Sequence, residues 1–128
     1  MKAAADARLD RVRGFIDSHY ARPLTVQKLA RQAGLSPFYF IRAFRAAFSV
    51  TPHQYLRRRR LARACELLVT TPLPVTEVCD RVGFHSLGSF SALFRREIGE
   101  TPKHYRATRR KAVSIPSCFV RMYRAGRL

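Results

Sequence analysis

Arginine carries the clearest chemical signal in this 128-residue sequence. Lysine and arginine together number 25 against 8 acidic residues, which gives a formal net charge of +17. All but four of the 25 are arginines, whose planar guanidinium matches phosphate oxygens and the O6 and N7 atoms of guanine. A polyanion is therefore the expected partner, and nucleic acid is the polyanion that fits best.

The other reactive side chains form no catalytic or metal-binding pattern. The four histidines do not pair with cysteines or carboxylates at ligand spacing, and the sequence has no Gly-rich phosphate loop. Three widely spaced cysteines without a CxxC motif (Cys65, Cys79 and Cys118) fit a reducing cytoplasm better than a disulfide framework or a zinc site. We therefore expect no enzyme, no metal and no cofactor; an oxidation switch at these cysteines is the minor alternative.

Length and hydropathy limit the class of protein further. A chain of this length allows one domain, or two very small ones that share a linker. Apolar residues make up 47% of the sequence, which is enough for a core despite the charge. No stretch of about 18 apolar residues occurs and residues 1–7 lack an apolar signal core. We therefore expect a cytoplasmic protein without a membrane span.

An internal repeat organises the chain. The sequence VQKLARQAG at residues 26–34 aligns with VTEVCDRVG at residues 75–83. Further on, the pattern F…FR…TP…Y at residues 40–55 recurs at residues 90–105. The offset grows from 49 to 50 between the two stretches, so the second copy carries one extra residue in its turn. We interpret this as two copies of one unit of roughly 30 residues.

Each copy is predicted to fold as a helix, a tight turn and a second helix. In the first copy, apolar residues recur at helical spacing until Gly34, a left-handed stop. Ser36 and Pro37 then restart the chain as N-cap and first-turn proline, and every fourth residue from Phe40 to Phe48 is phenylalanine. This layout is that of a helix-turn-helix. An ordinary αα-hairpin is the alternative, and the basicity and the duplication argue against it.

The predicted fold is all-α, with two helix-turn-helix subdomains joined by a long linker helix. A capping box from Thr51 to Gln54 opens the linker helix, which should run to about Val69. An amphipathic helix that should stop near Ala21 precedes the first unit. The expected divisions are the N-terminal helix with the first helix-turn-helix (1–50), the linker helix (51–70), the second helix-turn-helix with its following helix (71–110) and an unassigned basic and apolar tail (111–128).

The second helix of the first copy is the predicted reader of DNA bases. On a helical wheel, Phe38, Arg42 and Arg45 lie opposite the phenylalanine stripe, and Tyr39 and Ile41 flank them. Arg42 can bond guanine O6 and N7 in bidentate fashion, and Phe38 and Ile41 can contact thymine methyl groups. The alternative is that Phe38 packs under the preceding turn while Arg42 only coats the surface.

The corresponding helix of the second copy offers smaller side chains. Gly88 and Ala92, with Ser89 beside them, provide no bidentate readout, so specificity should reside mainly in the first copy. The complete set of predicted base-reading residues is Phe38, Tyr39, Ile41, Arg42, Gly88, Ser89 and Ala92. The residues expected to hold the phosphate backbone, by charge or by position at a helix N-terminus, are Ser36, Arg45, Arg57, Arg58, Ser86, Arg95 and Arg96.

Three runs of residues resemble the DNA-binding domain of the AraC/XylS family of bacterial transcription regulators, over about residues 6–107. They are LA…G…S…F…FR…P…YL from Leu29, RLARA…LL from Arg60 and V…VGF…SFS…FRR…G…TP…YR from Val78. The resemblance implies an all-helical fold that places two recognition helices in successive major-groove segments, with base contacts at the positions named above. Members of the family often carry arginine where Ala92 stands, so this chain departs from the family's pattern at a base-reading position of the second unit.

The resemblance also implies a function and a mode of binding. We expect a sequence-specific double-stranded DNA-binding transcription regulator, an activator that contacts RNA polymerase, bound to DNA as a monomer. Most family members carry a further effector-binding or dimerising domain, so this chain looks like a short stand-alone member or a cut-out domain. Two alternatives stay open: a generic RNA-binding or structural polycation, and a protein-interaction module in which Phe38 and Ile41 meet a partner protein.

Overall fold

The computed structural model describes residues 2–109, with side chains from residue 7 onward. The tail over residues 111–128, with Cys118, lies outside this part of the chain. Residues 2–109 form seven α-helices and no strand, which confirms the predicted all-α fold. In chain order the helices are α1 (Lys2–His19), α2 (Val26–Ala33), α3 (Pro37–Phe48), α4 (Pro52–Thr70), α5 (Val75–Arg81), α6 (Leu87–Ile98) and α7 (Pro102–Arg109).

Side-chain caps fix where α3 and α4 begin. The Ser36 hydroxyl accepts a hydrogen bond from the Tyr39 amide at 3.3 Å, and Pro37 fills the first position of α3. At the start of α4, the Thr51 hydroxyl accepts from the Gln54 amide at 3.2 Å, while the Gln54 side-chain oxygen accepts from the Thr51 amide at 3.0 Å. These contacts confirm the predicted N-cap and the predicted capping box.

The helix ends and turns follow the repeat. Helix α1 ends at His19, two residues before the expected Ala21, and α4 ends at Thr70, one residue beyond the expected Val69. In the first unit a left-handed residue, Gly34, separates α2 from the N-cap of α3. In the second unit α5 ends at Arg81 and the turn before α6 is longer, which confirms the extra residue.

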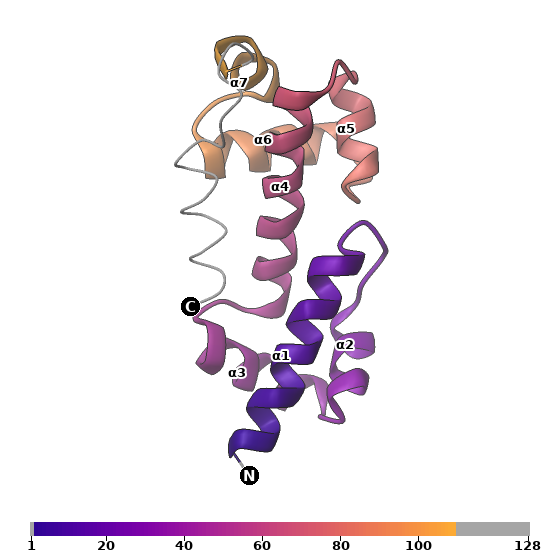
Figure 1. Ribbon diagram of the computed structural model, residues 1–128, viewed down its shortest axis with the longest axis vertical. Coiled ribbons are helices and arrows are strands. Elements are labelled where there is room, and N and C mark those ends of the chain that lie inside the picture. The colour runs from indigo at the N-terminus through magenta and orange to yellow at the C-terminus, as the bar shows by residue number, and fades with distance from the viewer. Residues whose placement is uncertain (1, 110–128) are drawn as a thin grey trace.

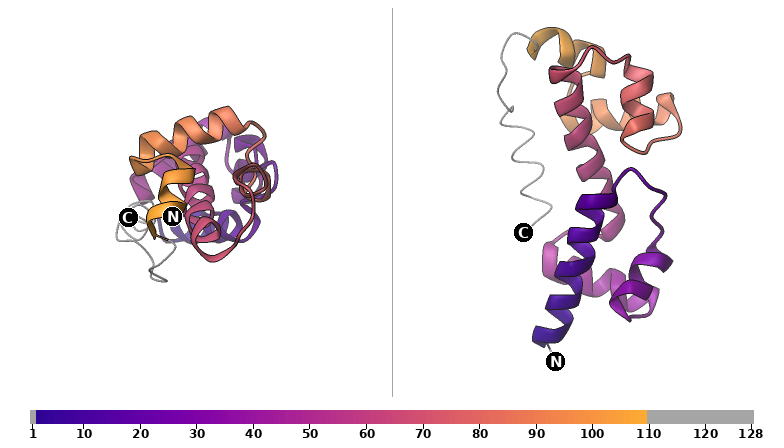
Figure 2. Two further views of the ribbon diagram at one scale, coloured as in Figure 1. Left: turned by 90° about the horizontal axis from the view of Figure 1, so that it is seen from above. Right: turned by 45° about the vertical axis from the view of Figure 1, so that its right-hand side comes forward.

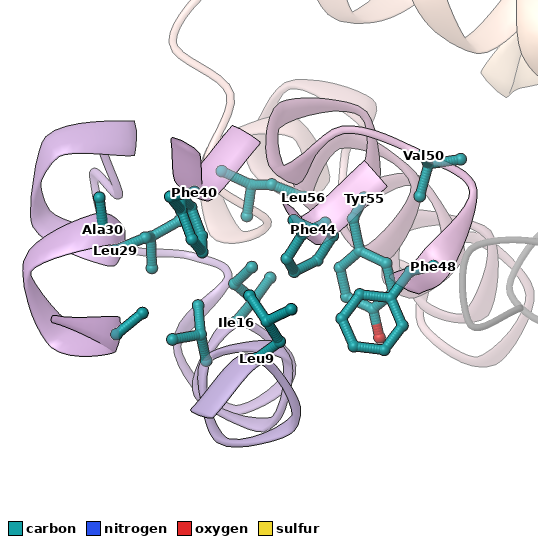
Figure 3. Close-up of a cluster of buried hydrophobic side chains, with 12 residues drawn as sticks. Leu9, Ile16, Leu29, Ala30, Phe40, Phe44, Phe48, Val50, Tyr55 and Leu56 are labelled. Atoms are coloured by element: carbon teal, nitrogen blue, oxygen red, sulfur yellow. The ribbon is translucent and has the colours of Figure 1, made fainter. Parts of the chain in front are cut away.

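The buried side chains form two clusters, one in each helix-turn-helix unit. The first cluster joins α1, α2, α3 and the start of α4 around the three phenylalanines of α3 (Figure 3). The second cluster joins the rest of α4 with α5, α6 and α7. Helix α4 contributes Tyr55 and Leu56 to the first cluster and Leu61 and Leu68 to the second. One helix therefore forms a wall of both cores.

Helix α4 also forms the long axis of the molecule. Figure 1 shows α1, α2 and α3 around one end of α4 and α5, α6 and α7 around the other, and the right-hand view in Figure 2 keeps the two groups apart. The 19 residues of α4 span about 28 Å at 1.5 Å per residue. The separation of the two units is therefore set by the length of a single helix. None of the helices described is both long and apolar enough to cross a membrane.

Candidate nucleic-acid interface

The first turns of α3 and α6 expose apolar surface that a folded domain normally buries. Within the described residues, the large hydrophobic side chains that stand in solvent are Phe38 (72% exposed), Tyr39 (54%) and Leu87 (42%). Phe38 and Tyr39 lie at the start of α3 and Leu87 at the start of α6. Burying a phenylalanine side chain is worth about 1.5–3 kcal/mol, so its exposure next to arginines makes this surface a candidate for contact with a partner.

On α3, the predicted reading residues share one exposed face. Arg42 and Arg45 are exposed, and the Arg42 guanidinium carbon lies 5.7 Å from the centre of the Phe38 ring. The ring and the guanidinium are one helical turn apart, so each limits the rotamers of the other. Ile41 is half-buried at the edge of this face. The alternative that packs Phe38 under the preceding turn is wrong, because nearly three quarters of the residue is open to solvent.

On α6, the predicted residues are also exposed but present little side-chain chemistry. Gly88, Ser89 and Ala92 face solvent, as do Arg95 and Arg96 near the end of the helix. A Cβ placed on Gly88 would meet only the Ser86 hydroxyl, at 3.8 Å. The fold therefore leaves room for a larger residue at position 88, and packing does not require the glycine.

The N-termini of α3 and α6 are open to an anion. The Ser36 and Ser86 hydroxyl oxygens accept hydrogen bonds from the amides of Tyr39 and Ser89, at 3.3 and 3.2 Å. Each hydroxyl proton remains available as a donor to an outside acceptor. Neither helix has an acidic residue in its first turn, so nothing negative competes for the partial positive charge of the helix N-terminus.

The run of four consecutive arginines in α4, at residues 57–60, divides into two pairs. Arg59 and Arg60 turn toward the protein: Arg59 lies 3.7 Å from the Asp17 carboxylate, and the Arg60 Nε donates to the carbonyl oxygen of Tyr20 at 2.6 Å. Arg57 and Arg58 are half-buried and make no hydrogen bond or ion pair with another residue among those described. This pair of cations lies in the first half of α4, between Leu56 of the first buried cluster and Leu61 of the second.

Two features of this surface escape the sequence argument. Leu87 occupies the position of Pro37 in the repeat, and an apolar residue there in both copies is the signal that could have found it. The inward turn of Arg59 and Arg60 has no local signal, because a run of four arginines covers every face of a helix. Within residues 2–109, no group of three or more His, Cys, Asp or Glu residues is placed to hold a metal ion.

Known proteins resemble this chain over most of its length. A family profile described as a helix-turn-helix domain matches residues 29–108. The regulatory protein SoxS of Salmonella typhimurium is 38% identical over 92 residues, which cover 72% of this chain and 86% of SoxS. A probable AraC family transcriptional regulator from Rhodopseudomonas palustris superposes with a TM-score of 0.74 at 30% identity, covering 81% of this chain and 98% of that one. The chain belongs to the AraC/XylS family.

Two further similar proteins bear on the interface. The DNA-binding domain of AdpA, whose crystal structure is in complex with a target DNA, has a TM-score of 0.77 at 35% identity and covers 80% of this chain and 93% of that domain. The transcriptional activator RhaS of Klebsiella pneumoniae is 35% identical over 104 residues, and the match spans only 37% of RhaS. The family consists of transcription regulators, as the sequence predicts, and not of enzymes.

Proposed function

We propose that this protein is a sequence-specific activator of transcription that binds double-stranded DNA as a monomer and reads two adjacent major-groove segments. The observation that carries this proposal is the exposure of Phe38, Tyr39 and Leu87 at the first turns of two recognition helices on one chain. Proteins with a single helix-turn-helix obtain their second recognition helix by dimerising, and successive major-groove faces lie about 34 Å apart. The formal net charge of +17 favours DNA as the polyanion.

The two units are proposed to divide the work. In the first unit, Arg42 reads a guanine while Phe38, with Tyr39 and Ile41 beside it, contacts the neighbouring base. In the second unit, Gly88, Ser89 and Ala92 let the helix approach the groove but specify little. The proposed backbone contacts come from the two helix N-termini and from arginines of α3, α4 and α6, namely Ser36, Ser86, Arg45, Arg57, Arg58, Arg95 and Arg96.

Activation is the expected regulatory sign. RhaS, which shares 35% identity with this chain, is named a transcriptional activator. An activator of this size would act in the bacterial cytoplasm by touching RNA polymerase while bound beside a promoter. An in vitro transcription assay on a selected site upstream of a promoter tests this, and reduced transcript would make the protein a repressor.

Selection of bound duplexes from a random DNA pool tests the central proposal. A monomeric two-unit reader should select a non-palindromic site with one strongly specified half, and sedimentation should show one protein per duplex at low concentration. A strict two-to-one complex on a palindrome would contradict it. Competition with bulk RNA separates the DNA regulator from a generic polycation, which would prefer neither polymer. Binding that does not weaken with salt would favour a protein partner instead.

The thymine methyl contact can be tested one atom group at a time. Once a site is selected, each thymine in its first half is replaced in turn by deoxyuridine, which lacks only the methyl group. Loss of one methyl contact should weaken binding by about threefold to tenfold. In a Phe38→Ala variant the same replacement should have no further effect, because the partner of the methyl group is already gone.

A further inference from the structure

The two units meet at a junction built from three chain segments, where Tyr20 packs against both buried clusters. The extensive helix packing stays within each unit or involves α4. Beside α4, however, the segment that follows α1 reaches the turn between α5 and α6, as Figure 1 shows near the lower end of α5. Arg60 of α4 lies at this meeting point. Its Nε donates to the Tyr20 carbonyl oxygen at 2.6 Å, and its Nη2 donates to the Arg22 carbonyl oxygen at 2.9 Å.

The same guanidinium contacts the second unit. Its central carbon lies 5.8 Å from the centre of the Phe84 ring, in the turn before α6. Gly83, also in that turn, is buried and has φ +102°, a conformation that a residue with a side chain rarely adopts. A Cβ on Gly83 would lie 2.9 Å from the Arg60 Nε and 3.1 Å from the Tyr20 carbonyl oxygen. A side chain at position 83 would therefore collide with its neighbours. Glycine lets the backbone of the second unit come close both to Arg60 and to the Tyr20 carbonyl of the first unit.

Neighbouring contacts hold the first-unit side of the junction in place. The Tyr20 side chain packs against both hydrophobic clusters, and the Arg59 guanidinium carbon lies 4.5 Å from the centre of its ring. Arg59 also lies 3.7 Å from the Asp17 carboxylate, which accepts a hydrogen bond from the Tyr55 hydroxyl at 2.7 Å. The Arg60 side chain is half-buried, and this desolvation lowers its pKa. The Arg60 guanidinium is thus held by its protein contacts and is not positioned as a solvent-facing phosphate contact.

We propose that the contacts of Arg60 with the Tyr20 and Arg22 carbonyl oxygens and with the Phe84 ring, beside Gly83, fix the orientation of α3 relative to α6 and thereby determine the half-site spacing that the protein accepts. Arg60 is then a positioning residue for DNA recognition. Helix α4 alone connects the units along one line, and a second point of contact beside it prevents one unit from twisting or bending against the other. This inference rests on the proposed two-segment reading of DNA for its consequence, but its structural half can be tested without DNA.

The variant that isolates the junction is Arg60→Lys. Lysine keeps the charge, so the general attraction to phosphates is unchanged, but a single ammonium cannot reproduce the fork that bonds two carbonyls and covers the Phe84 ring. Arg63→Lys is the matched control, since Arg63 lies on the same helix and its ion pair with Glu66 stays within that helix. A second variant, Gly83→Ala, disturbs the junction from the other side. Its control is Gly34→Ala, which replaces the left-handed glycine of the first unit. A Cβ on Gly34 would meet only the Arg8 Nη1 atom, at 3.4 Å.

The first measurement uses the free protein. Spin labels at Ala46→Cys on α3 and Glu97→Cys on α6, both exposed positions, report the distribution of distances between the two recognition helices. Cys118→Ser prevents labelling of the tail cysteine, and Cys65 and Cys79 are buried. The distribution should broaden at least twofold in Arg60→Lys and in Gly83→Ala, and it should match the wild type in both controls. An unchanged width in Arg60→Lys overturns the inference, whatever the protein does with DNA.

The second measurement uses a duplex selected by the wild-type protein and the same duplex with one base pair inserted between its halves. The insertion should weaken wild-type binding about 100-fold, because two rigidly held helices then cannot engage together. Arg60→Lys should bind the original duplex about tenfold more weakly and lose only about threefold more on insertion. Both proteins should bind an isolated half-site equally, which a merely destabilised variant would not do. An unchanged insertion penalty in Arg60→Lys overturns the inference; failure to select any two-part site overturns the proposed function instead.

Discussion

The two helix-turn-helix units have nearly the same core and different outer faces. Ring centres of Phe40 and Phe44 lie 5.7 Å apart, and those of their counterparts Phe90 and Phe94 lie 5.7 Å apart as well. The tyrosine of the following helix packs against the second ring in each unit, at 5.9 Å for Tyr55 and 5.5 Å in the second copy. Dense packing allows buried side chains only one geometry, and the same aromatic residues therefore pack in the same way in both copies of the repeat.

The outward positions follow no such constraint. Fifty residues apart, Gly88 stands where the first unit has Phe38, and Ala92 stands where it has Arg42. Arg95 corresponds to Arg45, so the cation nearer the end of each recognition helix is the same in both units. The difference separates two jobs that a helix-turn-helix performs, which are holding the phosphate backbone and reading bases. Under the proposed division of labour, both units hold the backbone, and the first unit does most of the base reading through Phe38 and Arg42.

The largest expected effect on DNA binding comes from replacing Arg42 and Arg95, one at a time, with alanine. Arg42→Ala should weaken binding to a selected site by about 1–3 kcal/mol and relax base preference in one half, because a bidentate contact to guanine is lost. Arg95→Ala should weaken selected and random duplexes nearly alike and lower the salt slope by about one, as expected for a phosphate contact. Titration of each variant with both duplexes at several salt concentrations distinguishes the two. If Arg95→Ala alters base preference as sharply as Arg42→Ala, the division of labour is wrong.

A smaller effect is expected at the ends of the recognition helices, where the units again differ. Ser49 ends α3 with φ +67° and Gly99 ends α6 with φ +95°. A residue with a Cβ pays an energetic penalty in this left-handed region that glycine does not. Ser49→Gly should therefore raise the free energy of unfolding by about 1 kcal/mol, and Gly99→Ser should lower it by a similar amount. Urea denaturation measures both, and equal shifts of the same sign would contradict the argument.

Much of the scaffold follows from local chemistry in the sequence. Ser36-Pro37 and Thr51-Pro52 begin helices because a hydroxyl cap and a proline without an amide proton suit the first turn wherever it occurs. The phenylalanines spaced four residues apart on α3 mark the face that is buried in the first core. The change of offset between the two repeat copies predicts the longer turn of the second copy. These features depend on residues within a few positions of each other, so the sequence suffices for them.

The junction around Arg60 could not be predicted in the same way. Its partners lie about 40 positions back along the chain, at the carbonyls of Tyr20 and Arg22, and carbonyl groups carry no sequence signature. The buried position of Gly83 likewise follows from where the first unit lies. Within the run of four arginines, local pattern could not separate Arg59 and Arg60, which bind other parts of the protein, from Arg57 and Arg58, because the distinction depends on tertiary packing. The exposure of Phe38 was predicted correctly only because the opposite face of α3 was already assigned to the core.

Replacing Gly88 tests whether the second unit reads bases through its backbone. Because a Cβ there would have open space, Gly88→Ala should stabilise α6 by about 0.5 kcal/mol through reduced backbone entropy in the unfolded chain. Under the proposed division of labour, DNA affinity should change by less than about twofold. Thermal unfolding and binding to the selected duplex are measured on the same preparation. A more stable protein with much weaker specific binding would show that α6 approaches a base or phosphate closely at this position.

The smallest expected effect distinguishes the units by pH. Helices α4 and α7 both open with Thr-Pro and carry a histidine in the first turn, but the two histidines have opposite surroundings. Partial desolvation lowers the pKa of His53 from 6.5, and the cations Arg57 and Arg60 lower it further. His104 instead contacts the Glu100 carboxylate at 2.6 Å, and Arg109 contacts the other oxygen of that carboxylate at 2.6 Å. Burial alone would raise the pKa of Glu100, but these two partners outweigh burial and hold it below 4.5.

The sign of each contribution follows from which state binds the proton first. As the pH is lowered below 6.5, His53 takes up a proton in the unfolded chain before it does so in the native protein. The free energy of unfolding therefore decreases with decreasing pH until the pH reaches the lowered pKa of the native state. Glu100 acts in a separate window, because its stabilisation is present above pH 4.5 and is lost as the pH falls through the lowered native value. In urea denaturation across both windows, His53→Gln should flatten the upper decline and leave the lower one, and Glu100→Gln should do the reverse. If His53→Gln leaves the upper decline intact, burial and the cations Arg57 and Arg60 do not disfavour the charged form of His53 in the folded protein.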